Sequence, residues 1–98
     1  MDDLRKQVDL IHDDLFKLFI QRIKLTEKIW IEKIQSNANY VDLSREQFLI
    51  HQHDHCSEFV ANPEMKKAYH FFIEQLINSN KEYLKKYIEN YKKAPHEE

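Results

Sequence analysis

Apolar residues follow a helical spacing from the start of the chain. They recur at intervals of four and three positions, with one interruption at Arg22, and no proline or glycine breaks the stretch. The positions are Leu4, Val8, Ile11, Leu15, Leu18, Leu25 and Ile29. This spacing places them along one face of a helix. The first polar break is Ser36-Asn37-Ala38-Asn39, so we expect a first helix from about Asp3 to Gln35.

Two further helices are predicted after this break. The second begins between Asp42 and Gln47 and runs toward Phe59. Its start has two possible caps: Ser44 and Gln47 are spaced as a capping box, and Asp42 is a competing N-cap. The third starts at Asn62-Pro63-Glu64, which supplies a cap, a proline in the first turn and an acid. It extends to about Tyr91, with an apolar seam of Met65, Tyr69, Phe72, Leu76, Ser79, Tyr83 and Tyr87.

The length of the first helix bears on assembly. At 1.5 Å per residue it measures about 50 Å, and two shorter helices cannot cover such a rod. We therefore expect an all-α, three-helix protomer with one very long N-terminal helix, in an intertwined homodimer. The 98 residues form one domain, 1–98, with an ordered core of about 4–91 and a tail from Lys92 to Glu98 that frays.

Composition narrows the function classes. The chain has no glycine, which excludes glycine-rich phosphate loops and nucleophile elbows, because these need positive φ or close backbone approach. Its net charge of -2 provides no general attraction to nucleic acid or acidic membranes, so we expect neither partner. The single cysteine, Cys56, excludes an internal disulfide. An acidic N-terminus and the lack of a membrane-length apolar run favour a cytoplasmic protein.

A histidine-rich segment invites a metal interpretation. It contains His51, His53, His55 and Cys56, of which only His51 and His55 share a helix face. No second pair of ligands stands at a recognisable spacing, so we expect solvated histidines, with a pH-sensitive patch as an alternative, and no metal site. A thiol nucleophile at Cys56 is not favoured either, because neighbours on a helix do not orient each other as nucleophile and base.

Cations stand where a core is expected. Arg22 occupies the seam of the first helix, and Lys33, eleven residues later, returns to within about 20° of the same face. Burying an unpaired charge costs several kcal/mol, so both cations need an anion. The pattern leaves two interpretations, an internal salt bridge with Asp42 or Glu46, or an anionic ligand. Arg5 lies about 25 Å before Arg22. By itself Arg5 is a solvated residue of the first turn; if it serves the same pocket, it comes from the partner of an antiparallel pair.

Taken together, these positions resemble a known family. The matching residues are Leu4-Arg5, Val8-Asp9, Arg22, Lys33, Asp42, Arg45-Glu46 and Ser79. In register, they resemble the all-helical, intertwined-dimer chorismate mutases over about residues 4–87. The resemblance implies rearrangement of chorismate to prephenate for aromatic amino-acid synthesis in the shikimate pathway, an isomerase reaction that needs no cofactor.

The resemblance also implies roles for individual residues. Arg22 would bind one substrate carboxylate, and Arg5 of the other subunit would bind the second. Lys33 would bond a carboxylate and the ether oxygen on which charge develops. The remaining implied site residues are Arg45 as an orienting group, Asp42 and Glu46 as acceptors, Ser79 as a carboxylate contact, and Ile29 and Leu76 as apolar walls.

One position departs from the family pattern. Tyr83 stands where the family places Gln or Glu to donate a second hydrogen bond to the ether oxygen; it is either a substitute catalytic donor or a core aromatic. Related activities on the same fold therefore stay open, namely an isochorismate pyruvate lyase or an aminodeoxychorismate mutase. A non-catalytic helical binding module is the alternative from another class.

Overall fold

The computed structural model describes residues 1–94, and helices account for most of them. The helices are α1 (Asp2–Gln35), α2 (Leu43–His51), α3 (Ser57–Ala61) and α4 (Pro63–Lys93). Residues 1–94 contain no strand, which confirms the all-α prediction. Of the tail expected to fray, Lys92 and Lys93 belong to α4, and 95–98 lie outside the described residues.

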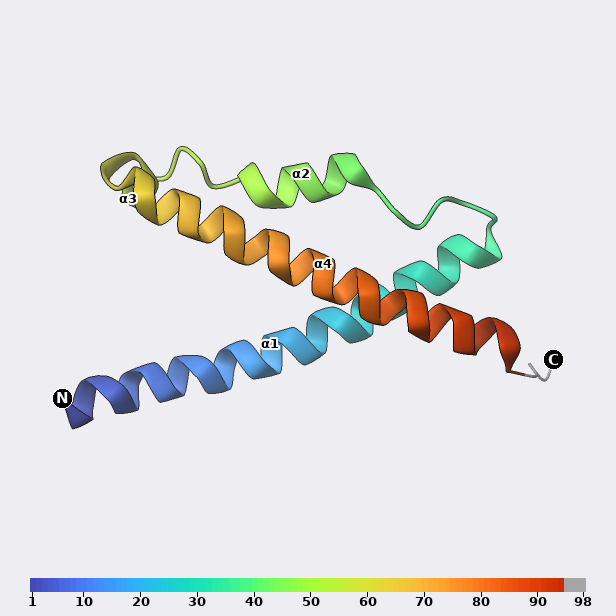
Figure 1. The fold of residues 1–98 in the computed structure, drawn as a ribbon, viewed down its shortest axis with the longest axis horizontal. Coiled ribbons are helices and arrows are strands. Elements are labelled where there is room, and N and C mark those ends of the chain that lie inside the picture. Colours follow the sequence, from blue (N-terminus) through green and yellow to red (C-terminus); the bar gives the residue numbers. More distant parts are fainter. Residues whose placement is uncertain (95–98) are drawn as a thin grey trace.

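The long first helix is confirmed. It spans 34 residues and ends where Asn37 adopts a left-handed φ of 60°, a conformation that asparagine tolerates better than most residues. The molecule is elongated, with extents of 55 × 32 × 17 Å and a radius of gyration of 17.3 Å. A compact domain of this length has a radius of gyration of about 13 Å. Figure 1 shows the cause: α1 crosses α4 with its C-terminal half and projects beyond it with its N-terminal half.

The buried core lies at this crossing. Trp30 of α1 packs against Leu84 and Ile88 of α4, and the Tyr40 ring lies 4.5 Å from the Trp30 ring between centroids. The N-terminal half of α1 has no comparable cover, since Leu4, Ile11 and Leu18 are each about 60% exposed. No helix within residues 1–94 combines the length and apolar character that a membrane crossing requires.

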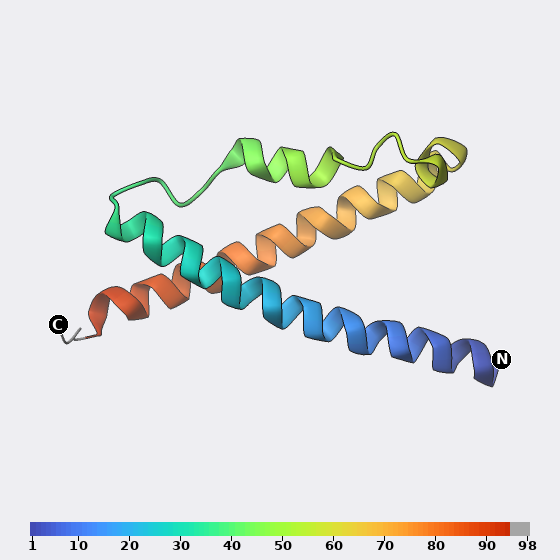
Figure 2. The ribbon, with the colours of Figure 1, turned by 180° about the vertical axis from the view of Figure 1, so that it is seen from behind.

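The second helix is shorter than the prediction. α2 ends at His51 and a turn over 52–56 separates it from α3, so the helix does not run to Phe59. The turn is held by the Asp54 carboxylate, which bonds His51 on one side and His70 of α4 on the other. α2 and α3 lie on one side of α4, and the N-terminal half of α1 diverges on the other (Figure 2).

The start of α4 matches the prediction, but its buried face does not. The Asn62 side chain accepts a hydrogen bond from the backbone N–H of Met65, and Pro63 occupies the first turn. The buried residues of α4 are Ile77, Asn80, Leu84 and Ile88. Met65, Phe72, Ser79 and Tyr83 are exposed, so the predicted seam is wrong at these four positions.

Candidate functional site

A cavity of about 270 Å³ lies between α1, α2 and α4 and brings together most of the predicted site residues. Those residues are Arg22, Ile29, Lys33, Asp42, Arg45 and Glu46. Helix α1 supplies the first three at its crossing with α4, and the start of α2 supplies the others. The cavity is close to the lower limit of small-molecule sites, about 300 Å³.

Arg22 is held in place by a side chain of α4. Its Nη1 donates a 2.7 Å hydrogen bond to Asn80 Oδ1, and Asn80 is only 2% exposed. Burial lowers the pKa of the Arg22 guanidinium, and the positive charge of Arg45 lowers that pKa further. A guanidinium nevertheless stays protonated at neutral pH. The site therefore contains two like charges close enough to oppose each other.

Lys33 lines the same cavity three turns further along α1. It is half-buried, and within residues 1–94 its ammonium makes no ion pair or side-chain hydrogen bond. Lys33 and Arg22 thus reach one space from one face of one helix, as their spacing predicts.

The two acids of the cavity are already engaged with other groups. Both oxygens of Glu46 accept from Lys81 Nζ, at 2.9 and 3.2 Å, in a half-buried ion pair. Asp42 is the N-cap of α2, where its carboxylate accepts from the Arg45 N–H at 3.0 Å. The internal salt bridge of Arg22 or Lys33 with either acid is therefore not present.

Arg45 completes the cationic side of the cavity. Its guanidinium carbon lies 5.1 Å from the centre of the Phe48 ring, so the side chain also rests on an aromatic face. After Lys81 is paired with Glu46, three cations remain around the cavity without an ion pair in the described part of the chain: Arg22, Lys33 and Arg45. This arrangement attracts an anion.

Four predicted site residues of the protomer, Arg5, Ser79, Tyr83 and Leu76, lie outside this cavity. Ser79 is exposed and its hydroxyl donates to the Leu76 carbonyl at 3.1 Å. The Tyr83 hydroxyl donates to Glu27 Oε1 at 2.9 Å, and this hydrogen bond raises the pKa of the phenol. Arg5 lies near the free end of α1, beside Leu4 and Val8. Neither Ser79 nor Tyr83 lines the cavity, although the Ser79 hydroxyl accepts a 3.5 Å hydrogen bond from Asn80 Nδ2.

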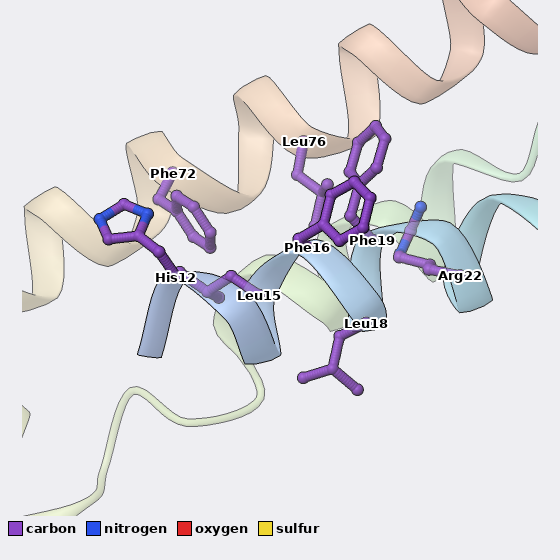
Figure 3. A pocket seen from close by; sticks show the side chains of 8 residues that line it. All are labelled: His12, Leu15, Phe16, Leu18, Phe19, Arg22, Phe72 and Leu76. Atoms are coloured by element: carbon purple, nitrogen blue, oxygen red, sulfur yellow. The ribbon is translucent and has the colours of Figure 1, made fainter. Parts of the chain in front are cut away.

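Leu76 lines a neighbouring, larger pocket instead. This apolar pocket of about 470 Å³ opens where α1 and α4 diverge. Its lining comprises His12, Leu15, Phe16, Leu18, Phe19, Arg22, Phe72 and Leu76 (Figure 3). Arg22 lines both spaces, so whatever fills the apolar pocket lies beside the cationic cavity.

Sequence reasoning missed the residues that α4 contributes to the cavity. Asn80 and Lys81 line it together with Ile77 and Leu84. A signal was present, because Asn80 stands three positions after Ile77 and four before Leu84, which makes it the polar member of an apolar helical stripe.

Comparisons of the chain with models of protein families, with curated proteins and with solved structures each find no match.

Proposed function

We propose that the cavity binds a small dicarboxylate and that the protein is a chorismate mutase, rearranging chorismate to prephenate. One observation carries the proposal: Arg22 and Lys33 line one cavity together with Arg45, and no acid within the described residues forms an ion pair with any of the three. Unpaired cations in a half-buried site are costly unless an anion completes them. The site is incomplete without such a guest.

The charges of the cavity suit this reaction. A concerted rearrangement of chorismate breaks an ether bond and needs no nucleophile, so the enzyme must hold the reactive conformer and stabilise charge as it develops. The Arg22 fork, oriented by Asn80, suits one carboxylate. Lys33 offers a compact charge for the ether oxygen.

The second carboxylate requires another cation, which we assign to Arg5 of a partner subunit. In an antiparallel pair of α1 helices, Arg5 meets the partner's Arg22 when the two-fold axis passes about midway between these positions, between Ile11 and Leu15. That point is also near the middle of the exposed apolar seam that runs from Leu4 to Leu25. One pairing thus covers the seam and completes the site. A strictly monomeric mass in solution would remove Arg5 from the site.

The test is the consumption of chorismate by the purified protein, followed by its absorbance. Arg22→Ala and Lys33→Ala should each reduce turnover by about 10²–10³, the usual effect of deleting a group that stabilises transition-state charge. Lys28→Ala is the matched control, because Lys28 is an exposed cation of the same helix and does not line the cavity. Circular dichroism shows whether each variant folds.

Two further measurements separate the alternatives. A rate equal to the buffer blank defeats the mutase proposal. Pyruvate released from isochorismate then identifies a lyase on the same cavity. If neither substrate reacts, thermal stabilisation by chorismate that depends on Arg22 identifies a binding module.

A further inference from the structure

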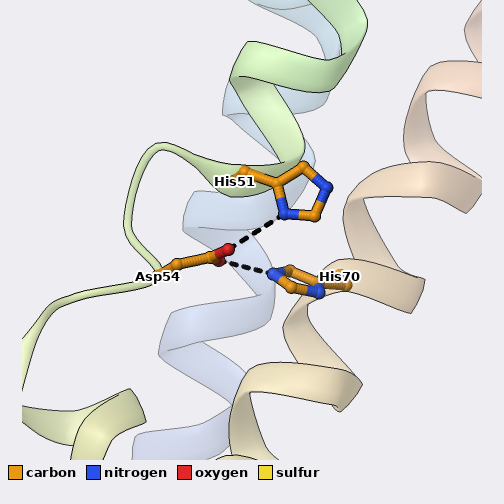
Figure 4. Close-up of side chains that lie close together, drawn as sticks. All are labelled: His51, Asp54 and His70. Atoms are coloured by element: carbon orange, nitrogen blue, oxygen red, sulfur yellow. Dashed lines mark hydrogen bonds and ion pairs between the residues drawn. The ribbon is translucent and has the colours of Figure 1, made fainter.

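Three side chains from three segments converge away from the cationic cavity. His51 ends α2, Asp54 lies in the turn before α3, and His70 belongs to α4. Asp54 Oδ2 lies 2.9 Å from His51 Nδ1, and Asp54 Oδ1 lies 2.6 Å from His70 Nε2 (Figure 4). One ligating atom from each side chain lies within 4.8 Å of the others.

Two imidazoles and a carboxylate form a ligand set that Zn²⁺ and related divalent transition metals prefer. Tetrahedral zinc with bonds of 2.0–2.1 Å holds its ligand atoms about 3.3 Å apart. The short contact that the ligating oxygen of Asp54 makes therefore lengthens by less than about 1 Å around an ion. The widest separation, at most 4.8 Å, shortens by no more than about 1.5 Å.

The burial of the three groups suits an ion with one open position. The side chains of Asp54 and His70 are 21% and 20% exposed, whereas that of His51 is 50% exposed. Packing thus fixes two ligands, and the solvent side leaves room for a water molecule. The Asp54 carboxylate supplies a negative charge that favours a cation.

The neighbouring histidines do not share this arrangement. His53 is exposed and its ring lies 6.2 Å from that of Tyr69, between centroids. His55 and Cys56 are also exposed, and neither belongs to the three-residue group. A continuous helix would align His51 with His55. In the structure His51 lies instead beside His70, which belongs to another helix.

We propose that His51, Asp54 and His70 bind a divalent transition metal of the zinc class, with water as the fourth ligand. His51 would ligate through Nδ1 and His70 through Nε2, the nitrogens that donate to Asp54 when no ion is bound. The ion would therefore displace the protons from these two nitrogens, and each bound ring would carry its proton on the other nitrogen. The ion would tie the turn after α2 to α4 and would stabilise the folded chain in proportion to its occupancy. This proposal is independent of the cationic cavity.

The experiment titrates Zn²⁺ into chelator-treated, full-length protein by calorimetry and follows the melting temperature. One ion per chain and a raised melting temperature are expected. His70→Ala and Asp54→Asn should each weaken binding at least tenfold, because each leaves only two of the three protein ligands unaltered. His55→Ala and Cys56→Ser are the controls and should bind Zn²⁺ as the wild type does.

Co²⁺ provides a measurement that needs no variant, since a four-coordinate site gives strong visible absorption that Zn²⁺ abolishes by displacement. If the wild type gives neither a zinc heat nor this absorption, the proposal is overturned. Binding that persists in His70→Ala but is lost in His55→Ala also overturns it, because the ion is then held by neighbouring surface histidines of one segment.

Discussion

Asn80 determines how Arg22 is presented to the cavity. Its amide oxygen is a neutral acceptor, so it orients the guanidinium at 2.7 Å without cancelling its charge. Asn80→Asp keeps the size of the side chain but places a carboxylate against Arg22. We expect the affinity for chorismate to fall about tenfold or more, because the guanidinium then has an internal counterion.

Asn78→Asp is the matched control for this variant, since it adds the same charge to an exposed position of the same helix. Calorimetric titration of both variants with chorismate is the measurement. Equal affinities in the two variants would show that Arg22 does not bind the ligand's negative charge.

Tyr83 has a different place from the one that the family resemblance implies. Its hydroxyl bonds Glu27 and it does not line the cavity. Tyr83→Gln should therefore leave chorismate turnover within about twofold of the wild type, because surface substitutions away from a site cause small changes. The chorismate assay measures this directly, and a large gain of rate would place position 83 at the reacting atoms after all.

The contact of Tyr83 with Glu27 also has a pH dependence. The hydrogen bond to Glu27 raises the phenol pKa, so the contact stabilises the folded state below the ordinary value near 10 and loses this effect as pH rises through the raised pKa. The titration of Tyr83 is followed by phenolate absorbance, from which the signal of the same protein carrying Tyr83→Phe is subtracted. The midpoint of this titration should be lower in Glu27→Gln than in the wild type. Glu74→Gln is the control, and identical midpoints in all three proteins would refute the assignment.

At the scale of elements, the short helix α2 depends on one capping residue. Asp42 accepts the Arg45 N–H, whereas no such bond from Ser44 is present within residues 1–94. Asp42→Ala should lower the free energy of unfolding by about 1 kcal/mol, the usual cost of losing an N-cap. Ser44→Ala should change it by less than about 0.5 kcal/mol. Denaturant unfolding compares the two, and an equal loss would favour the capping box.

The sequence predicts correctly those features that depend on residues close together in the chain. The spacing of Arg22 and Lys33 and the start at Asn62-Pro63 depend on residues within one helix, and both predictions agree with the structure. The end of α2 does not depend on local residues alone, because Asp54 in the turn after it is held partly by His70, sixteen residues later on another helix. The buried face of α4 likewise depends on how it crosses α1, which selects Asn80 and Leu84 over Ser79 and Tyr83.

At the scale of the whole molecule, α1 leaves a long apolar surface uncovered in the protomer. Exposed apolar side chains run along its N-terminal half, including Val8 and Phe16 at 50% and 66% exposure. Soluble monomers rarely expose contiguous apolar patches of this kind. The apolar pocket beside Arg22 places part of this surface next to the cationic cavity. In the proposed dimer, one contact between subunits would therefore cover the apolar surface of α1 and complete the cationic cavity.

This dimer predicts that two inactive variants restore each other. In a heterodimer of Arg5→Ala with Arg22→Ala, one of the two sites receives intact Arg5 from one chain and intact Arg22 from the other, while the second site lacks both. After co-refolding of equal amounts, half of the dimers are mixed, so chorismate turnover should recover to about a quarter of the wild-type value.

The control is a mixture of Arg22→Ala with Lys33→Ala. These residues line one cavity of the same chain, so no intact site forms and no activity should return. Recovery in the control, or none in the first mixture, would refute the contribution of Arg5 from the opposite subunit.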